Sequence, residues 1–187
     1  MLERLDARTR GASKISDIRW WTLTATASQD RYRSHLIDVY GFEAAVEAAI
    51  LYSPDFATVV DRRPHPRSGL VAADLLTLGL TPVEITNLPQ YAITPFAGPA
   101  TALGWWYVLD RSTRLFADWH ARLAVQMPSC DAFAYLGMHR RNPVEEWDEL
   151  CALVDRAVTS LEMEADVVAA AADALDSERA WYRRARP

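Results

Sequence analysis

The hydrophobic residues of this chain recur with a helical period along nearly its whole length, and this pattern constrains the fold more than any other feature. Near the start, Leu2, Leu5 and Trp20 fall on one face at three- and four-residue spacing. No stretch alternates apolar and polar residues between turn signals, as a half-buried strand would. The sequence therefore predicts an all-α fold.

Capping and stop signals divide the pattern into six predicted helices. Ser28 is a typical N-cap for the second helix, and Gly79 follows the third as a C-terminal stop. Asn142-Pro143-Val144-Glu145 and Thr159–Glu162 carry the signals that open the last two. The predicted helices are Leu2–Trp21, Gln29–Tyr52, Gly69–Leu78, Ala100–Val125, Pro143–Val158, and a last one from Thr159–Glu162 to Arg183.

Prolines mark the segments between these helices. Ser53–Ser68 is predicted to be a loop, and Leu80–Pro99 to be extended chain with a turn begun by Thr81 and Glu84. Neither segment resembles a linker between domains, and the chain has no internal repeat. We therefore expect residues 1–187 to form a single domain.

Charge and hydropathy exclude several classes of partner. The net charge is −5, which argues against a dedicated nucleic-acid-binding protein. No run approaches the roughly 18 apolar residues of a membrane span, and the N-terminal segment is charged rather than leader-like. Two cysteines do not make a disulfide scaffold. We expect a cytoplasmic protein with neither nucleic-acid nor membrane partners.

Glycine is scarce and tryptophan is common. The chain has 7 glycines and 7 tryptophans, whereas average usage predicts about 13 glycines. Neither G-x-G-x-x-G nor G-x-x-x-x-G-K-[ST] occurs. These features argue against a nucleotide site built on a glycine-rich loop.

The predicted helix Ala100–Val125 combines very large apolar residues on one face with charges on the other. At about 100° per residue, Asp110, Arg111, Arg114, Asp118 and Arg122 face solvent. The inward face holds Trp105, Val108, Leu109, Ser112, Leu115, Phe116, Trp119 and Leu123. The pattern predicts a helix that packs into the core.

The same helix carries a family resemblance. Tyr107-Val108-Leu109-Asp110-Arg111-Ser112-Thr113 resembles the Y-V-L-E-G-S-T segment of bacterial haem (heme) oxygenases, especially the biliverdin-producing enzymes associated with bacteriophytochromes. Other segments match in order: Leu5–Thr9, Arg31–Glu47, Leu70–Gly79 (the L-x-x-D-L-x-x-L-G segment), Phe133–Trp147 and Val168–Trp181. The resemblance implies the heme-oxygenase-like fold, in which haem lies between the first helix and a kinked distal helix.

The sequence departs from the family at both sides of the haem. Ser13 stands where the family has its proximal His, and a hydroxyl is a poor iron ligand. Arg111, Leu115 and Phe116 stand where the distal helix has glycines, which allow close approach to the ligand. Trp119 adds bulk one turn later. We therefore expect a pseudoenzyme with no catalytic residues and no haem cofactor.

Such a protein would act through binding or interaction. The space next to Ser13 would be filled by Trp20, Leu115, Phe116 and Trp119, or reshaped for a bilin, another tetrapyrrole or a different small apolar ligand. Arg8 and Lys14 are candidate partners for propionates. The aromatic end of the last helix, Trp181-Tyr182, suggests a homodimer contact.

The alternative is an active, divergent haem oxygenase that makes biliverdin with another axial ligand. His35 on the second helix is the best candidate for that ligand. His65, His120 and His139 are expected to face solvent or to serve structural roles. Only this alternative calls for haem as a cofactor.

Other chemistries have little support in the sequence. No His is preceded by Glu or Asp at the third position before it, as a di-iron site on facing helices would need. Glu43 and Glu47 lie one turn apart on an apolar face, and Glu47 is expected to be a buried structural carboxylate paired with an arginine. Cys151 is expected to be an unreactive thiol in a helix, and Cys130 lies in a loop. No G-x-S-x-G nucleophile elbow occurs.

Overall fold

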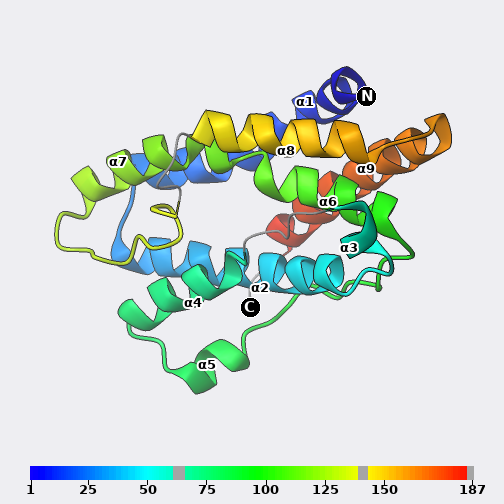
Figure 1. Cartoon of the computed structure of the whole chain (residues 1–187). Helices are drawn as coiled ribbons and strands as arrows, with labels where there is room; N and C mark the ends of the chain where they lie inside the picture. The colour runs from blue at the N-terminus through cyan, green and yellow to red at the C-terminus, as the bar shows by residue number, and fades with distance from the viewer. Residues whose placement is uncertain (61–65, 139–142, 185–187) are drawn as a thin grey trace.

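The computed structural model describes residues 1–60, 66–138 and 143–184, with the backbone alone for residues 2, 8–16 and 143. These residues form nine α-helices and one short 3₁₀ helix, with no strand among them (Figure 1). The all-α prediction is confirmed. The elements are α1 (Leu2–Ala25), α2 (Gln29–Leu51), α3 (Phe56–Val59), α4 (Ser68–Thr77), α5 (Pro82–Thr86), α6 (Pro99–Asp110), η1 (Thr113–Leu115), α7 (Phe116–Gln126), α8 (Pro143–Ala157) and α9 (Leu161–Arg183).

Most predicted helix boundaries hold to within a residue or two, because local capping determines them. The Ser28 side chain accepts a hydrogen bond from the Arg31 backbone N–H at the start of α2. The cap of α9 is Ser160, one residue later than predicted, because Ser160 has the extended backbone and its hydroxyl accepts from the Met163 N–H. The predicted N-cap Asn142 lies outside the described residues.

The two proline-rich segments contain short helices that we did not predict. The predicted turn at Thr81 and Glu84 becomes α5, because the two residues form a reciprocal capping box around Pro82. In the first segment, α3 places Phe56 in the core, where it is 5% exposed. Burial of this one ring accounts for a helical turn that periodicity could not reveal.

The single helix predicted over Ala100–Val125 is wrong. The chain leaves the α-helix after Asp110, forms η1, and resumes as α7 at Phe116. The Thr113 hydroxyl donates to the Asp110 carbonyl (2.7 Å) and the Arg111 guanidinium donates to the Val108 carbonyl (3.0 Å). Carbonyls at the end of α6 thus gain side-chain partners, which allows the helix to end there.

This break also overturns the predicted orientation of Arg111. The projection placed its side chain in solvent, but Arg111 is only 4% exposed and donates to Glu178 on α9 at 2.8 Å. The projection assumed a continuous helix through Arg111, where the chain in fact leaves the α-helix. Arg111 is thus a buried arginine that forms an ion pair with Glu178.

Helix α6 is central in the fold, since it contacts α2, α3, α8 and α9. Figure 1 shows it between the long helices α2 and α9, with α4 and α5 on the far side of α2. The α6 and α9 backbones come very close at Gly104, where an added Cβ would lie 2.5 Å from the Val167 carbonyl oxygen. No helix in the described ranges is long and apolar enough to cross a membrane.

The buried side chains form two clusters. The larger surrounds α6 and α9 and includes Leu103, Trp105 and Trp106. The second joins the end of α1 to α2, α4 and α7, and it includes Trp20, Phe116 and Trp119, with Leu115 packed against it. The second cluster therefore contains every predicted pocket-filling residue whose side chain is described.

Candidate functional site

Aromatic rings pack together between the end of α1 and the start of α7. Trp20 of α1 stacks on Trp119 of α7, with ring centroids 4.9 Å apart and planes 9° apart. Phe116 lies 5.8 Å from Trp119, and both residues are at most 1% exposed. Leu115 is half-buried beside them. These residues therefore gather between α1 and α7, while their role as fillers of a haem site stays a prediction.

A cavity of about 20 Å³ lies next to these rings, with Trp20 and Phe116 in its wall. This volume suits about one water molecule, whereas pockets for small ligands usually have about 300–1,000 Å³. Polar and aromatic side chains from several helices line it: Asp17, Arg19, Trp20, His35, Glu43, Leu109, Ser112, Phe116, Tyr135, Glu178 and Tyr182. This cavity is therefore too small for haem.

His35, the candidate iron ligand, is packed between two aromatic rings. Its ring lies edge-on to Trp20 at 4.2 Å and parallel to Tyr182 at 6.3 Å, and the residue is 5% exposed. His120 is half-buried and lies 5.0 Å from the Phe133 ring. The imidazole of His35 thus forms part of the cavity wall.

Several predicted site residues lie outside the described part of the chain. The side chains of Arg8, Ser13 and Lys14 are among them, although the α1 backbone passes through these positions. His65 and His139 are also outside the described residues. Their predicted roles stay predictions.

A buried ionic network lies on one side of the cavity. The Arg67 guanidinium donates to Glu43 (3.2 Å) and to the Leu109 carbonyl (2.8 Å), and it lies 3.4 Å from Asp110. Arg67 and Glu43 are 2% and 7% exposed. This network ties α2 and the start of α4 to the end of α6.

Glu47 is the buried structural carboxylate that the sequence predicts. It accepts hydrogen bonds from the backbone N–H groups of Arg67 (2.6 Å) and Ser68 (3.1 Å), and also from the Ser68 hydroxyl. The arginine it meets is Arg67, but the Arg67 guanidinium pairs with Glu43 instead. Glu47 therefore caps the start of α4 rather than forming the expected side-chain ion pair.

Burial raises the pKa of Glu43 to about 7. The Arg67 charge and the Tyr135 hydroxyl, which donates to Glu43 at 2.7 Å, both oppose this rise without cancelling it. Burial also raises the pKa of Tyr135 well above its ordinary value. Glu43 is thus a cavity-lining carboxyl that changes its charge near neutral pH.

Asp74 is a structural residue that our sequence reasoning passed over. It lies within the family-like segment Leu70–Gly79, and its carboxylate accepts the backbone N–H groups of Ala134 (2.7 Å) and Tyr135 (2.9 Å). Asp74 is 1% exposed. It therefore fixes the loop that presents the Tyr135 hydroxyl to Glu43. The sequence did offer a signal for this role, because Asp74 is the one acidic residue in an otherwise apolar helix and a buried acid needs hydrogen-bond partners.

Metal and thiol chemistry find no support in the structure. Among the residues it describes, no three His, Cys, Asp or Glu side chains are grouped to hold a metal ion. Cys130 is buried and Cys151 half-buried, and neither forms a disulfide. Burial raises the pKa of Cys151 to about 11, which agrees with the predicted unreactive thiol.

An open groove of about 510 Å³ lies between the end of α1 and the start of α2. Its volume falls within the range of small-molecule sites. The residues along it are Arg19, Thr22, Leu23, Thr26, Asp30, Arg31, Ser34 and His35. Arg19 and His35 also line the inner cavity, so they lie between groove and cavity. The groove arises from the packing of two helices, which no single-helix pattern could show.

Trp181 offers little exposed surface for the homodimer contact predicted at Trp181-Tyr182, which itself stays a prediction. Its indole N–H donates to the Asp38 carbonyl at 2.9 Å, and the residue is 8% exposed. The ring also packs close to Gly41, where an added Cβ would meet it at 2.6 Å. Trp181 therefore anchors α9 to α2 and offers little surface to a second chain.

Comparison with known proteins gives no match: no family model fits the sequence, and no curated protein or solved structure is significantly similar to it. Functional inference therefore rests on the residues and their geometry.

Proposed function

We propose that this chain is a haem-oxygenase-like protein that does not oxygenate haem and acts as a binding protein for a small apolar ligand, such as a bilin. The observation that carries this proposal is the buried stack of Trp20 on Trp119, 4.9 Å between ring centroids. These two rings pack with Phe116 between α1 and α7, beside a cavity of about 20 Å³.

The course of the chain from α6 to α7 supports the likeness to haem oxygenases. The interruption at residues 111–115 falls in the segment where the resemblance implies a kinked distal helix. In this chain the bend forms without glycine, through the side-chain bonds of Arg111 and Thr113 to the end of α6. A bent backbone with bulky side chains is consistent with a fold that is retained while its inner site is closed.

The position of His35 supports loss of haem turnover. An axial ligand must present a ring nitrogen to the iron on an open face. The His35 ring instead packs against Trp20 on one side and Tyr182 on the other. Ligation by His35 would require both α1 and the end of α9 to move.

Titration of the purified chain with haemin and, separately, with biliverdin tests the proposal. We expect no Soret band typical of axial imidazole ligation and no biliverdin formation with any reductant. We expect biliverdin itself to bind with one-to-one stoichiometry, followed by tryptophan quenching. A one-to-one haemin complex that is turned over would overturn the proposal, and its loss in His35→Ala would establish the alternative enzyme.

A homodimer and a cytoplasmic location belong to the proposal as well. Size-exclusion chromatography with light scattering checks the first. A mass of one chain, 21.0 kDa, would contradict the homodimer without bearing on ligand binding.

A further inference from the structure

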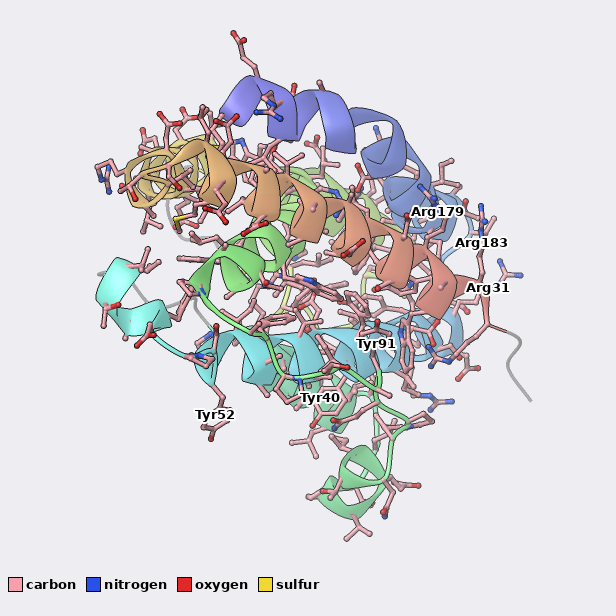
Figure 2. All side chains as sticks on the ribbon, turned by 90° about the vertical axis from the view of Figure 1, so that its right-hand side faces the viewer. Arg31, Tyr40, Tyr52, Tyr91, Arg179 and Arg183 are labelled. Carbon is pink, nitrogen blue, oxygen red and sulfur yellow. The ribbon has the colours of Figure 1, made fainter. Side chains whose placement is uncertain are left out.

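The α1–α2 groove is bordered by more positive than negative charge, although the chain as a whole has a net charge of −5. Arg19 and Arg31 line it directly. Figure 2 shows that the labelled Arg31, Arg179 and Arg183 lie along the same edge of the molecule. Arg179 forms an ion pair with Asp176 at 2.9 Å, so the positive charge next to the groove comes mainly from Arg19 and Arg31. This charge favours an anionic ligand.

The acids near the groove are already paired. Asp30 is exposed but forms an ion pair with Arg33 at 2.8 Å. Asp38 has a side chain that is 5% exposed and lies 2.8 Å from Arg19 and 3.5 Å from Arg184. The charge of Asp38 is therefore already neutralised by the arginines beside it. The acids therefore do not cancel the attraction of the groove for an anion.

The two arginines of the groove differ in how firmly they are held. Arg19 donates to Asp38 and to the Tyr182 carbonyl (3.0 Å), and its guanidinium lies 4.6 Å from the Tyr182 ring. Arg31 is exposed, and its Nη1 donates to the Thr26 carbonyl at 3.1 Å. In the described part of the chain this is its one side-chain hydrogen bond, so Nε and Nη2 are available. Arg31 is therefore the better direct partner for an anion, and Arg19 supplies a fixed charge.

The rest of the groove offers little competing hydrogen bonding. The hydroxyls of Thr22 and Thr26 donate to carbonyls of their own helix, those of Ile18 (2.7 Å) and Thr22 (3.3 Å). Leu23, which is 7% exposed, contributes an apolar surface between them. A ligand here would meet the Arg31 guanidinium together with the threonine methyl groups and the exposed part of Leu23.

We propose that the groove between α1 and α2 binds a small amphipathic anion, with its carboxylate, sulfonate or phosphate on Arg31 and its apolar part along Leu23. Guanidinium pairs well with such groups because its donors match their oxygens in a bidentate geometry. The inference rests on the proposed role as a binding protein and names the site and ligand class for it.

A matched pair of fluorescent probes tests this site. One is 1-anilinonaphthalene-8-sulfonate, and the other is N-phenyl-1-naphthylamine, which lacks the sulfonate. Arg31→Glu should weaken binding of the sulfonate probe about tenfold or more and change that of the neutral probe less than about twofold. Thr22→Trp, which adds bulk within the groove, should abolish binding of both. Circular dichroism and thermal melting confirm that each variant is folded.

Arg156→Glu is the control, since this exposed arginine lies on α8 and does not line the groove. It should leave both probes unchanged. If Arg156→Glu and Arg31→Glu weaken binding of the sulfonate probe equally, the effect comes from overall charge, and the proposed site is wrong. Unchanged sulfonate-probe binding in Thr22→Trp would also overturn it, because the probe would then lie elsewhere.

Competition identifies the chemical source of the anion. Oleate, dodecyl phosphate and inorganic phosphate are each used to displace the sulfonate probe. Displacement by either amphiphile but not by inorganic phosphate supports the proposal and distinguishes carboxylate from phosphate. Displacement by inorganic phosphate alone contradicts the amphipathic ligand. If biliverdin fails to bind while Arg31 still controls the probe, the bilin assignment fails and the groove site stands.

Discussion

The Trp20 indole on α1 stacks on the Trp119 indole on α7, with centroids 4.9 Å apart and planes 9° apart. Trp119 is fully buried, and Trp21 contacts its edge at 6.1 Å. Residues about one hundred positions apart thus join two helices through flat aromatic surfaces. Such contacts stabilise a fold by burial of large area together with favourable ring geometry.

Trp119→Ala should lower the free energy of unfolding by about 3–5 kcal/mol, because it removes a fully buried indole and leaves a cavity. Urea denaturation followed by circular dichroism measures this change. Val125→Ala on the same helix is the control, since Val125 is 80% exposed and its loss should cost less than about 0.5 kcal/mol. Similar costs for both variants would mean that the stack contributes little.

Glu43 should make the protein less stable as the pH rises. Its folded-state pKa of about 7 lies above the ordinary value of 4.5, so between these values the folded chain holds a proton that the unfolded chain has lost. The stability due to this protonation is fully present below about pH 4.5 and is lost as the pH rises through 7.

Glu43→Gln should remove this dependence, since a glutamine side chain does not titrate. Relative to the natural chain, the variant should gain up to about 3 kcal/mol between pH 4.5 and 8. Urea melts at several pH values give the difference. Glu162→Gln, at an exposed position, provides the comparison and should show no such trend. A difference between the Glu43→Gln variant and the natural chain that is independent of pH would contradict a raised pKa.

Two glycines should respond oppositely to substitution by Ala. At Gly104 the new Cβ would lie 2.5 Å from the Val167 carbonyl oxygen and 2.8 Å from the Ala171 nitrogen, so α6 and α9 must separate. This should cost about 1–3 kcal/mol. At Gly69 in α4 nothing lies within 4 Å, and Gly69→Ala should stabilise by about 0.5–1 kcal/mol. Thermal melts compare the two variants. A loss of stability in Gly69→Ala would contradict the open surroundings of that site.

Asp74→Ala should destabilise the protein by roughly 1.5–3 kcal/mol, because the Ala134 and Tyr135 N–H groups lose a charged acceptor. Hydrogen exchange offers a specific check. The amide protons of Ala134 and Tyr135 should exchange much faster in the variant, while those of α6 and α9 change only in line with global stability. Retained protection at Tyr135 would show that another group holds the loop.

Helical periodicity and capping predicted the elements because both are local. Ser28 caps α2 as expected, since its hydroxyl needs only the N–H three residues on. The inward positions of Phe116 and Trp119 followed from their spacing, and the structure places both in the core with Trp20. Local rules also explain the one-residue error at Ser160, since two neighbouring hydroxyl residues could each cap α9.

The buried ion pairs and hydrogen bonds around the inner cavity join residues that lie far apart in the sequence, so local patterns did not predict them. Arg111 can be buried because its guanidinium donates to Glu178, which lies 67 residues later. Arg111 also donates to the Val108 carbonyl and so helps to end α6, where periodicity predicted a continuous helix. The Arg67 guanidinium donates to Glu43, which lies 24 residues earlier in the sequence. Asp74 accepts the backbone N–H of Tyr135, which lies 61 residues later. A pattern of hydropathy does not show which distant residue pairs with a charged group, so it could not predict these contacts.

The sequence by itself thus determined an all-helical chain with bulky aromatics on its inner faces. Tertiary structure decided that Trp20 and Trp119 meet and close the inner space, and that α1 and α2 leave a groove beside Arg31. The reason is physical: helix formation depends on neighbours within four residues, whereas cavities and buried ion pairs depend on how whole helices pack.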